Sequence, residues 1–276
     1  MTLSHAILLF VAAVLAGAMN SVAGGGSFFS FPALIFTGVP PIPANATNTV
    51  AVWPGSVASV FSYWRRLPRS ARVMAPLVTI SLIGGTLGAL VLLHTPQATF
   101  MRLVPYLFGI ATLLFAFGKR LTEKLGHVVK GTGPPSWPAL AGLTLVQFLI
   151  ALYGGFFGGG MGILMLAMLE MIHIEDIHAM NGLKALLGTA INGAAVVTFI
   201  VARQVYWPQG ILMIVGAVAG GYGGAHYAQK LDPRWVRATV IAVGTGMTLY
   251  FLWRYSFRVR NSRSPPRVSG CHKSVS

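Results

Sequence analysis

The sequence predicts an all-α polytopic membrane protein with about eight transmembrane helices in two homologous four-helix halves. Of its 276 residues, 55% are hydrophobic and only 9% are charged, whereas about a quarter are charged in ordinary soluble domains. No Asp, Glu, Lys or Arg occurs between Met1 and Trp64. A Gly-Gly-Gly stretch also occurs in each half of the chain. These observations exclude a soluble enzyme, a nucleic-acid-binding protein and a disordered chain, and they make the lipid bilayer the protein's surroundings.

Charge-poor runs predict the crossings. They fall at 5–37, 45–63, 73–93, 103–118, 138–170, 180–201, 208–228 and 238–253. The runs 5–37 and 138–170 hold 33 residues each, which is too long for one straight helix in a hydrocarbon core of about 30 Å. We therefore expect the first helix of each half to be broken at its glycine stretch, because consecutive glycines weaken a helix. A kinked crossing and a re-entrant hairpin both remain open.

The positive-inside rule sets the expected orientation, an inner (plasma) membrane protein with both termini cytoplasmic. Eight crossings place 15 Lys and Arg residues inside and four outside, the four being Arg102, Lys230, Arg234 and Arg237. If each glycine break were instead the tip between two full crossings, the loop at 119–130 would face outward and this bias would collapse. The formal net charge of +15 is thus attributed to topology rather than to nucleic-acid binding.

An internal repeat defines the expected domains. Gly24 to Gly26 recur as Gly158 to Gly160, and Asn45 matches Asn181 at a nearly identical offset along the chain. The domains are an N-terminal membrane repeat at 1–118, a cytoplasmic linker at 119–136, a C-terminal membrane repeat at 137–253 and a basic, disordered cytoplasmic tail at 254–276. Four crossings in each half would give the halves the same orientation, with a symmetry axis along the membrane normal.

Two kinds of glycine receive different interpretations. Gly84 and Gly88, like Gly216, Gly220 and Gly224, have the four-residue spacing that lets helices approach closely, and we predict helix packing for them. The two triplets place small residues on most sides of a helix, which one neighbour does not require. Interrupted segments at corresponding positions of two halves indicate a binding site near the membrane midplane.

Lys184 is the one ionisable residue that stands out within a predicted crossing, and such residues are costly and usually functional. Its alternatives are snorkelling to the interface and contact with an anionic substrate. The predicted crossings hold no central Asp or Glu, and helix N-termini at the breaks attract anions. The predicted substrate-binding residues are Gly24, Gly25, Gly26, Ser27, Asn45, Asn48, Gly158, Gly159, Gly160, Asn181 and Lys184.

Other chemistry receives little support. The segment 173–178, His-Ile-Glu-Asp-Ile-His, has metal-binding composition but no established spacing, so neither a metal nor a cofactor is predicted. Ser27 could be a nucleophile in an intramembrane hydrolase, but no base can be assigned to it. Cys271 is the one cysteine, which rules out a disulfide framework. An anion channel and a non-transporting scaffold share the same composition and stay open.

Six stretches of the chain are distinctive. They are AGAMNSVAGGGSFFSFPAL at 16–34, VPPIPANATNT at 39–49, GGFFGGGMG at 154–162, MNGLK at 180–184, GGYGGA at 220–225 and LDPRWVR at 231–237. Together they resemble the sulfite exporter TauE/SafE family of bacterial transmembrane permeases. The resemblance covers nearly all of 5–253 and leaves the tail from Ser256 to Ser276 without a counterpart. It implies an inner-membrane carrier built from two related halves, for sulfite, an organosulfonate or another small anion.

The combined hypothesis is a secondary transporter, and more specifically an exporter, that moves such an anion by alternating access rather than an enzyme. The partners expected are a small anionic solute and the bilayer, with no nucleic acid. No oligomeric state is predicted.

Overall fold

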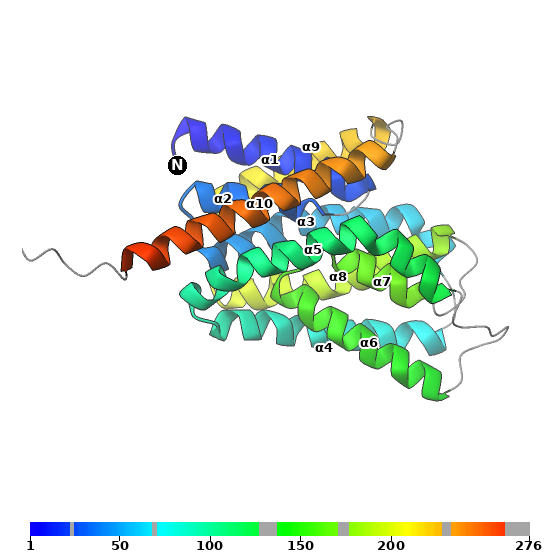
Figure 1. The fold of residues 1–276 in the computed structure, drawn as a ribbon. Coiled ribbons are helices and arrows are strands. Elements are labelled where there is room, and N and C mark those ends of the chain that lie inside the picture. The colour runs from blue at the N-terminus through cyan, green and yellow to red at the C-terminus, as the bar shows by residue number, and fades with distance from the viewer. Residues whose placement is uncertain (23–24, 68–70, 127–136, 171–176, 228–232, 263–276) are drawn as a thin grey trace, which may run out of the picture.

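The protein is a bundle of α-helices, as a computed structural model shows (Figure 1). The structure describes residues 1–22, 25–67, 71–126, 137–170, 177–227 and 233–262. The elements are α1 (Leu3–Val22), α2 (Ser27–Phe36), α3 (Pro41–Tyr63), the 3-10 helix η1 (Trp64–Arg66), α4 (Ala71–His94), α5 (Gln97–Gly126), α6 (Trp137–Phe156), α7 (Met161–Glu170), α8 (Ile177–Val201), α9 (Trp207–Tyr227) and α10 (Pro233–Ser262).

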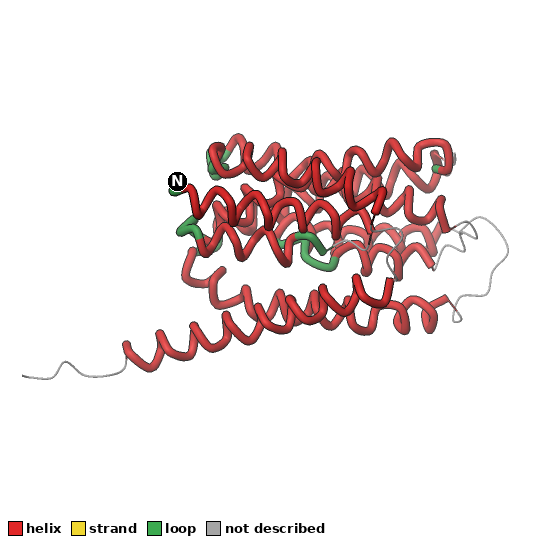
Figure 2. Tube along the Cα trace, turned by 90° about the horizontal axis from the view of Figure 1, so that it is seen from above, coloured by secondary structure: helices red, strands yellow, loops and turns green. Residues whose placement is uncertain are grey.

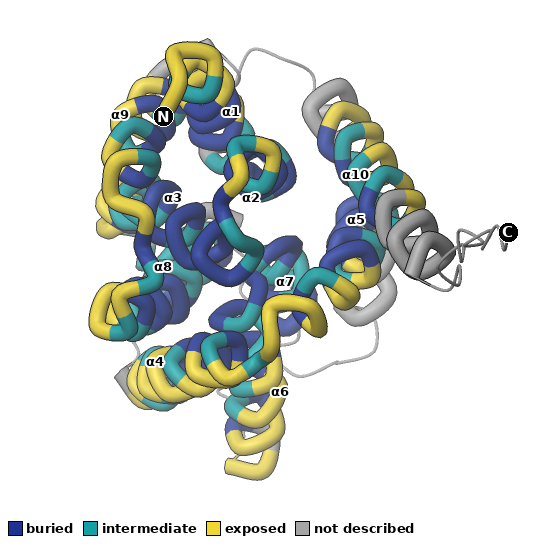
Figure 3. The backbone as a smooth tube through the Cα atoms, turned by 90° about the vertical axis from the view of Figure 1, so that its left-hand side faces the viewer, coloured by how far each residue is buried: buried dark blue, intermediate teal, exposed yellow. Residues whose placement is uncertain are grey.

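The outer surface of the bundle is apolar. In the described residues four helices are long and apolar enough to cross a membrane, within α1, α4, α5 and α8. Large hydrophobic side chains such as Leu113 and Val215 face outward. In the end-on view of Figure 3 the short helices α2 and α7 lie with α3 at the centre, and the exposed residues lie at the periphery. The all-α prediction is confirmed, and an apolar exterior of this kind is the lipid-facing surface of a multi-pass membrane protein.

Glycines bring two pairs of helices into close contact. A methyl group at Gly88 would collide with the Leu152 carbonyl oxygen in the α4–α6 pair, and one at Gly220 would collide with the Val14 carbonyl oxygen in the α1–α9 pair. Gly84 and Gly216 approach the same partner helices. The packing interpretation of these four glycines is therefore confirmed. The surroundings of Gly224 lie outside those that the structure describes.

The chain reverses direction at both helix interruptions. Gly26 lies directly against the Ala16 carbonyl oxygen, so α2 folds back along α1. At the second interruption, a Cβ placed on Gly154, near the end of α6, would lie 2.7 Å from the sulfur of Met161, the first residue of α7. The start of α7 therefore packs against the last turns of α6. Figure 1 shows α2 returning toward the end where α1 starts. The segments 5–37 and 138–170 are hairpins of a long and a short helix, and the kinked-crossing alternative is wrong.

This reversal also corrects the expected symmetry. α3 and α8 run antiparallel, because Trp53 contacts Gly193 while Tyr63 contacts Gly182. α5 and α10 are antiparallel as well, with Gly109 against Thr248 and Thr112 against Gly244. α3 and α8, and likewise α5 and α10, which hold corresponding places in the two sequence halves, therefore run in opposite directions. Figure 2 shows that the helices of the bundle extend in roughly one common direction. The expectation of two halves with the same orientation fails, because each hairpin adds a reversal that a kinked crossing lacks.

The ends of the chain follow from the same reversals. The first residues of α1 and the last turns of α10 lie at one end of the bundle, whereas α3 ends, and α4 and α6 begin, at the other (Figure 1). The joint prediction that both termini and the linker at 119–136 occupy one side is therefore inconsistent with the helix directions. The linker itself lies largely outside the described residues.

Candidate functional site

The first hairpin is closed by backbone contacts that only glycine permits. Gly25 has φ +87°, a conformation that L-residues with side chains rarely adopt. A Cβ at this position would also lie 2.7 Å from the ring of Phe115. The Gly26 N–H donates to Asn20 Oδ1 at 2.8 Å, which joins the end of α1 to the start of α2.

The polar atoms of the first hairpin are paired with α3. Asn48 Nδ2 donates to Ser27 Oγ at 3.1 Å, and the hydroxyl of Ser30 donates to Asn48 Oδ1. Ser30 Oγ also lies 3.2 Å from the Gly26 carbonyl oxygen. Asn48 is 2% exposed, so this neutral network satisfies buried groups that would otherwise cost free energy.

The second hairpin has the same form. Gly158 and Gly160 have φ +79° and +76°, and the Tyr153 hydroxyl donates to the Gly159 carbonyl oxygen. Asn45 Nδ2 donates to the Phe156 carbonyl oxygen at the end of α6, at 3.2 Å. α3 therefore contacts both hairpins through Asn45 and Asn48, which are three positions apart and lie on one helix face.

A cation lies against the second hairpin. Lys184 Nζ donates to Asn181 Oδ1 at 3.1 Å, and both side chains are half-buried. The Lys184 Cδ atom lies 3.7 Å from a Cβ placed on Gly162, so the lysine stem crosses the first turn of α7. The positive end of the α7 dipole and an ammonium group thus occupy the same region, and both favour a negative ligand.

The two hairpins meet against α5. Gly25 contacts Phe115 and Gly160 contacts Ala111, and these two α5 positions lie four apart on one helix face. Phe31 of α2 and Phe157 of the second hairpin also pack edge to face, with their ring centroids 6.1 Å apart. The interruptions are therefore adjacent inside the bundle, as the sequence interpretation required.

Comparison with known proteins now decides the family. The family model described as sulfite exporter TauE/SafE matches residues 9–251. The chain belongs to this family. The resemblance seen in the glycine-rich motifs is confirmed, and TauE/SafE membership makes the chain a membrane transporter protein with a solute as its partner.

Similar proteins from other bacteria carry the names of transporters. A "Probable membrane transporter protein ORF9" of Sinorhizobium sp is 31% identical over 245 residues, which is 88% of this chain and 91% of the relative. A "Probable membrane transporter protein" of Haemophilus influenzae is 26% identical, covering 87% and 92%. "Probable membrane transporter protein YfcA" of Escherichia coli K12 is 28% identical, covering 89% of each chain. No solved structure matches significantly.

The predicted site residues of this TauE/SafE chain form two groups rather than one. Asn45 and Asn48 lie near the start of α3, whereas Gly182, beside Asn181, contacts Tyr63 at its end. Lys184 therefore lies beside α7, at a different level along the bundle axis from the hydrogen bonds of Asn48. The remaining predicted residues, Gly25, Gly26, Ser27, Gly158, Gly159 and Gly160, lie in the two hairpins, and Gly24 lies outside the described residues.

Three residues of the site were missed by the sequence interpretation. Ser30 follows Ser27 by three positions and so shares its helix face, a signal that could have revealed it. Gly162 repeats the small-residue pattern of the second triplet. Tyr153 gave no signal, because its hydroxyl reaches Gly159 only when the chain reverses.

Within the part of the chain that the structure describes, no group of three His, Cys, Asp or Glu side chains could hold a metal. The candidate segment 173–178 lies mostly outside that part.

Proposed function

We propose that the protein is a secondary transporter of a small anion, such as sulfite, an organosulfonate or a short carboxylate. The observation that carries this proposal is the position of Lys184 across the first turn of α7. The positive end of a helix dipole repels a cation at the helix N-terminus. A bound anion would be attracted by both the cation and the dipole, which would make the arrangement favourable. Charged side chains inside membrane bundles mark substrate pathways when they face the interior.

The repeat architecture supports alternating access. The starts of α1 and α6 have the same separation along the chain as those of α2 and α7. The pairs α3 and α8, α4 and α9, and α5 and α10 share a second, slightly larger separation. Since corresponding helices run in opposite directions, we propose an inverted-topology repeat with units at 1–118 and 137–253. Transporters of this kind bind substrate near the midplane, at discontinuous helices that belong to the two repeats. The eight long helices would be the crossings, with α2 and α7 as re-entrant elements.

Charge counts support an orientation in the cell inner membrane that differs from the initial expectation. The segments 64–72, 118–136 and 228–237 lie at the end where α3 ends and carry eleven Lys and Arg. Apart from the tail, the opposite end carries Arg102, near the start of α5, and Arg203, between α8 and α9. Six further cations lie in 254–276. Because the positive-inside rule acts through short loops, we propose that the linker at 119–136 is cytoplasmic and that both termini lie on the other side.

Export is the direction that the membrane potential favours. With the cytoplasm negative, moving one negative charge outward gains about 2.3 kcal/mol per 100 mV. An exporter of a monovalent anion therefore needs no coupling ion.

The alternatives make different demands on the same residues. A hydrolase would need a base near Ser27, but the Ser27 hydroxyl accepts a hydrogen bond from the Asn48 amide, which cannot remove its proton. A channel and a scaffold are separated from a carrier by transport kinetics, because only a carrier exchanges solute across the membrane by alternating access.

Counterflow in proteoliposomes tests the proposal. Vesicles loaded with unlabelled sulfite, methanesulfonate or acetate should take up trace labelled anion of the same kind above its equilibrium level, with one class clearly preferred. Uptake that never exceeds equilibrium, together with single-channel current, would support a channel. Neither uptake nor current with any of the three anions would refute anion transport of this class.

A further inference from the structure

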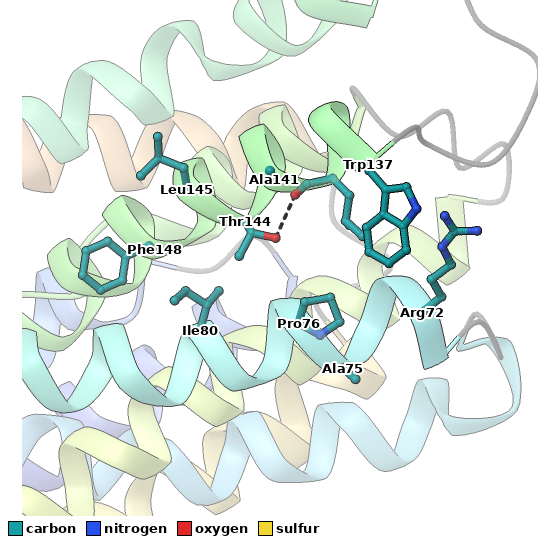
Figure 4. Close-up of a pocket in the computed structure, with 10 residues that line it drawn as sticks. Arg72, Ala75, Pro76, Ile80, Trp137, Ala141, Thr144, Leu145 and Phe148 are labelled. Atoms are coloured by element: carbon teal, nitrogen blue, oxygen red, sulfur yellow. Dashed lines mark hydrogen bonds between the residues drawn. The ribbon is translucent and has the colours of Figure 1, made fainter.

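An apolar groove lies between α4 and the first half of α6, and none of the glycines at the two helix interruptions lines it. It is open to the surroundings, has a volume of about 790 Å³, and is walled by side chains that include Pro76 and Ile80 of α4 and Leu145 and Phe148 of α6. Figure 4 shows Pro76 and Ile80 of α4 on the side that faces Thr144 and Phe148 of α6. The Thr144 hydroxyl donates to the Leu140 carbonyl oxygen at 2.8 Å, so it is satisfied within its own helix. The walls are therefore apolar, and the hydroxyl hydrogen of Thr144 is already used in a hydrogen bond.

The sequence of α4 explains why the groove exists. α4 approaches α6 closely at Gly84 and Gly88, but its residues 71–83 contain no glycine. Before that contact, Ala75, Pro76 and Ile80 of α4 and Ala141 and Leu145 of α6 line the open groove. In the related α1–α9 pair, Gly216 occupies the repeat position that corresponds to Ile80, and it lies 2.9 Å from the Phe10 carbonyl oxygen in the same test. The groove is thus specific to one of the two pairs.

The open end of the groove carries a cation on an aromatic ring. The Arg72 Cζ atom lies 4.6 Å from the centroid of the Trp137 ring, and both residues line the cavity. A guanidinium carries five N–H donors in its own plane, and contact with the face of an indole leaves donors available to another acceptor. These donors match the oxygens of a phosphate. The lining residues that the structure describes include no carboxylate.

We propose that this groove binds one anionic glycerophospholipid, with its phosphate on Arg72 and an acyl chain between α4 and α6. The polarity of the groove changes from charged to apolar along its length, as that of a lipid does. Tryptophan is also typical of the membrane interface, where a headgroup lies. A helix of a second copy would instead place apolar side chains beside Arg72. On the proposed orientation the site faces the cytoplasmic leaflet, and it is independent of which solute is transported.

Native mass spectrometry of the full chain tests the proposal. The protein is released from mixed micelles that contain equal amounts of phosphatidylglycerol and phosphatidylcholine with identical acyl chains. One Arg near the membrane surface contributes about 1 kcal/mol of attraction for an anionic lipid, so we expect about a fivefold preference for one bound phosphatidylglycerol. Arg72→Gln should reduce this preference to about one. Arg65→Gln, an exposed cation of the adjacent η1 that does not line the groove, should retain it.

A second pair of variants tests the acyl-chain position. Ala141→Phe places a ring in the groove and should reduce retention of both lipids, whereas Val146→Phe, on α6 but outside the lining, should not. If Ala141→Phe does not fold, Ala75→Phe on the opposite wall serves the same purpose. Equal retention of the two lipids by the wild type, an unchanged preference in Arg72→Gln, or full retention in the groove-filling variants would each overturn the proposal. A dimer that the groove-filling variants dissociate would assign the groove to a second copy instead.

Discussion

The two hairpins have the same backbone form but different polar chemistry. In the first, Asn48 of α3 contacts the first turn of α2 and pairs with Ser27 and Ser30. In the second, Lys184 of α8 contacts the first turn of α7. Positions 48 and 184 correspond in the proposed repeat, because their separation along the chain equals that between the starts of α3 and α8. One of these positions thus holds a neutral side chain that satisfies its own surroundings, and the other holds a cation.

On the proposed function, this difference separates a structural role for Asn48 from a solute-binding role for Lys184. The Asn48 network lies within the protein, so its removal should lower stability whether or not solute is present. Lys184 has a donor capacity of three N–H groups, and its bond to Asn181 uses one of them. Its removal should therefore affect solute binding more than folding.

The largest expected difference in stability is between two variants that each add one methyl group, one in each hairpin. Gly26→Ala would drive a Cβ into the Ala16 carbonyl oxygen, and we expect a loss of about 3 kcal/mol in stability or failure to fold. Gly162→Ala meets only the flexible Lys184 stem at 3.7 Å and should keep stability within about 0.5 kcal/mol. Thermal unfolding of both variants in the same detergent measures the difference. Equal stability of the two variants would contradict the packing described for the first hairpin.

Removing the polar side chain from α3 or α8 should have a smaller effect. Asn48→Ala leaves two serine hydroxyls of α2 without their amide partner and should cost about 1–2 kcal/mol. Lys184→Ala removes a half-buried charge and should cause no measurable loss. Unfolding midpoints in detergent without added anion provide the test. A destabilised Lys184→Ala protein with normal transport would show that Lys184 has a structural role.

The smallest expected loss of stability concerns a hydrogen bond between α4 and α6. Gln147 Nε2 donates to Ser81 Oγ at 2.7 Å between α6 and α4, whereas the corresponding repeat positions in α1 and α9 are Ala13 and Ala217. Ser81→Ala should cost about 1 kcal/mol, because it leaves the buried Gln147 amide unpaired. The double variant Ser81→Ala, Gln147→Leu should recover most of this loss. A double-mutant cycle that shows simple additivity would exclude the coupling.

The sequence predicted the helical class, the glycine contacts of α4 and α9, and the involvement of Asn45 and Asn48 with the interruptions. It did not predict the direction of the chain after each interruption. A glycine run weakens a helix but carries no information on whether the next helix continues or returns. The return depends on contacts between residues far apart in the sequence, such as Gly160 with Ala111. The relative direction of the two halves depends on that return, and so does the expectation that the termini and the linker share one side, so these two expectations failed together.

The length of the broken segments contained part of the missing information. Each run of 33 residues is too long for one crossing and too short for two full ones. A helix of 20 residues followed by one of 10 residues, as in α1 with α2 and α6 with α7, fits the same length as a crossing with a partial return. The identity of the polar partners, in particular Tyr153 and Ser30, still required the folded arrangement.

Anion flux through Lys184 variants tests the central claim most directly. With the preferred anion identified by counterflow, Lys184→Gln should reduce its exchange rate in proteoliposomes by about tenfold or more, because it removes a charge-assisted contact. Lys184→Arg should retain part of the rate, because it keeps the positive charge. Exchange by Lys184→Gln at the wild-type rate, with folded protein at equal density, would contradict the account.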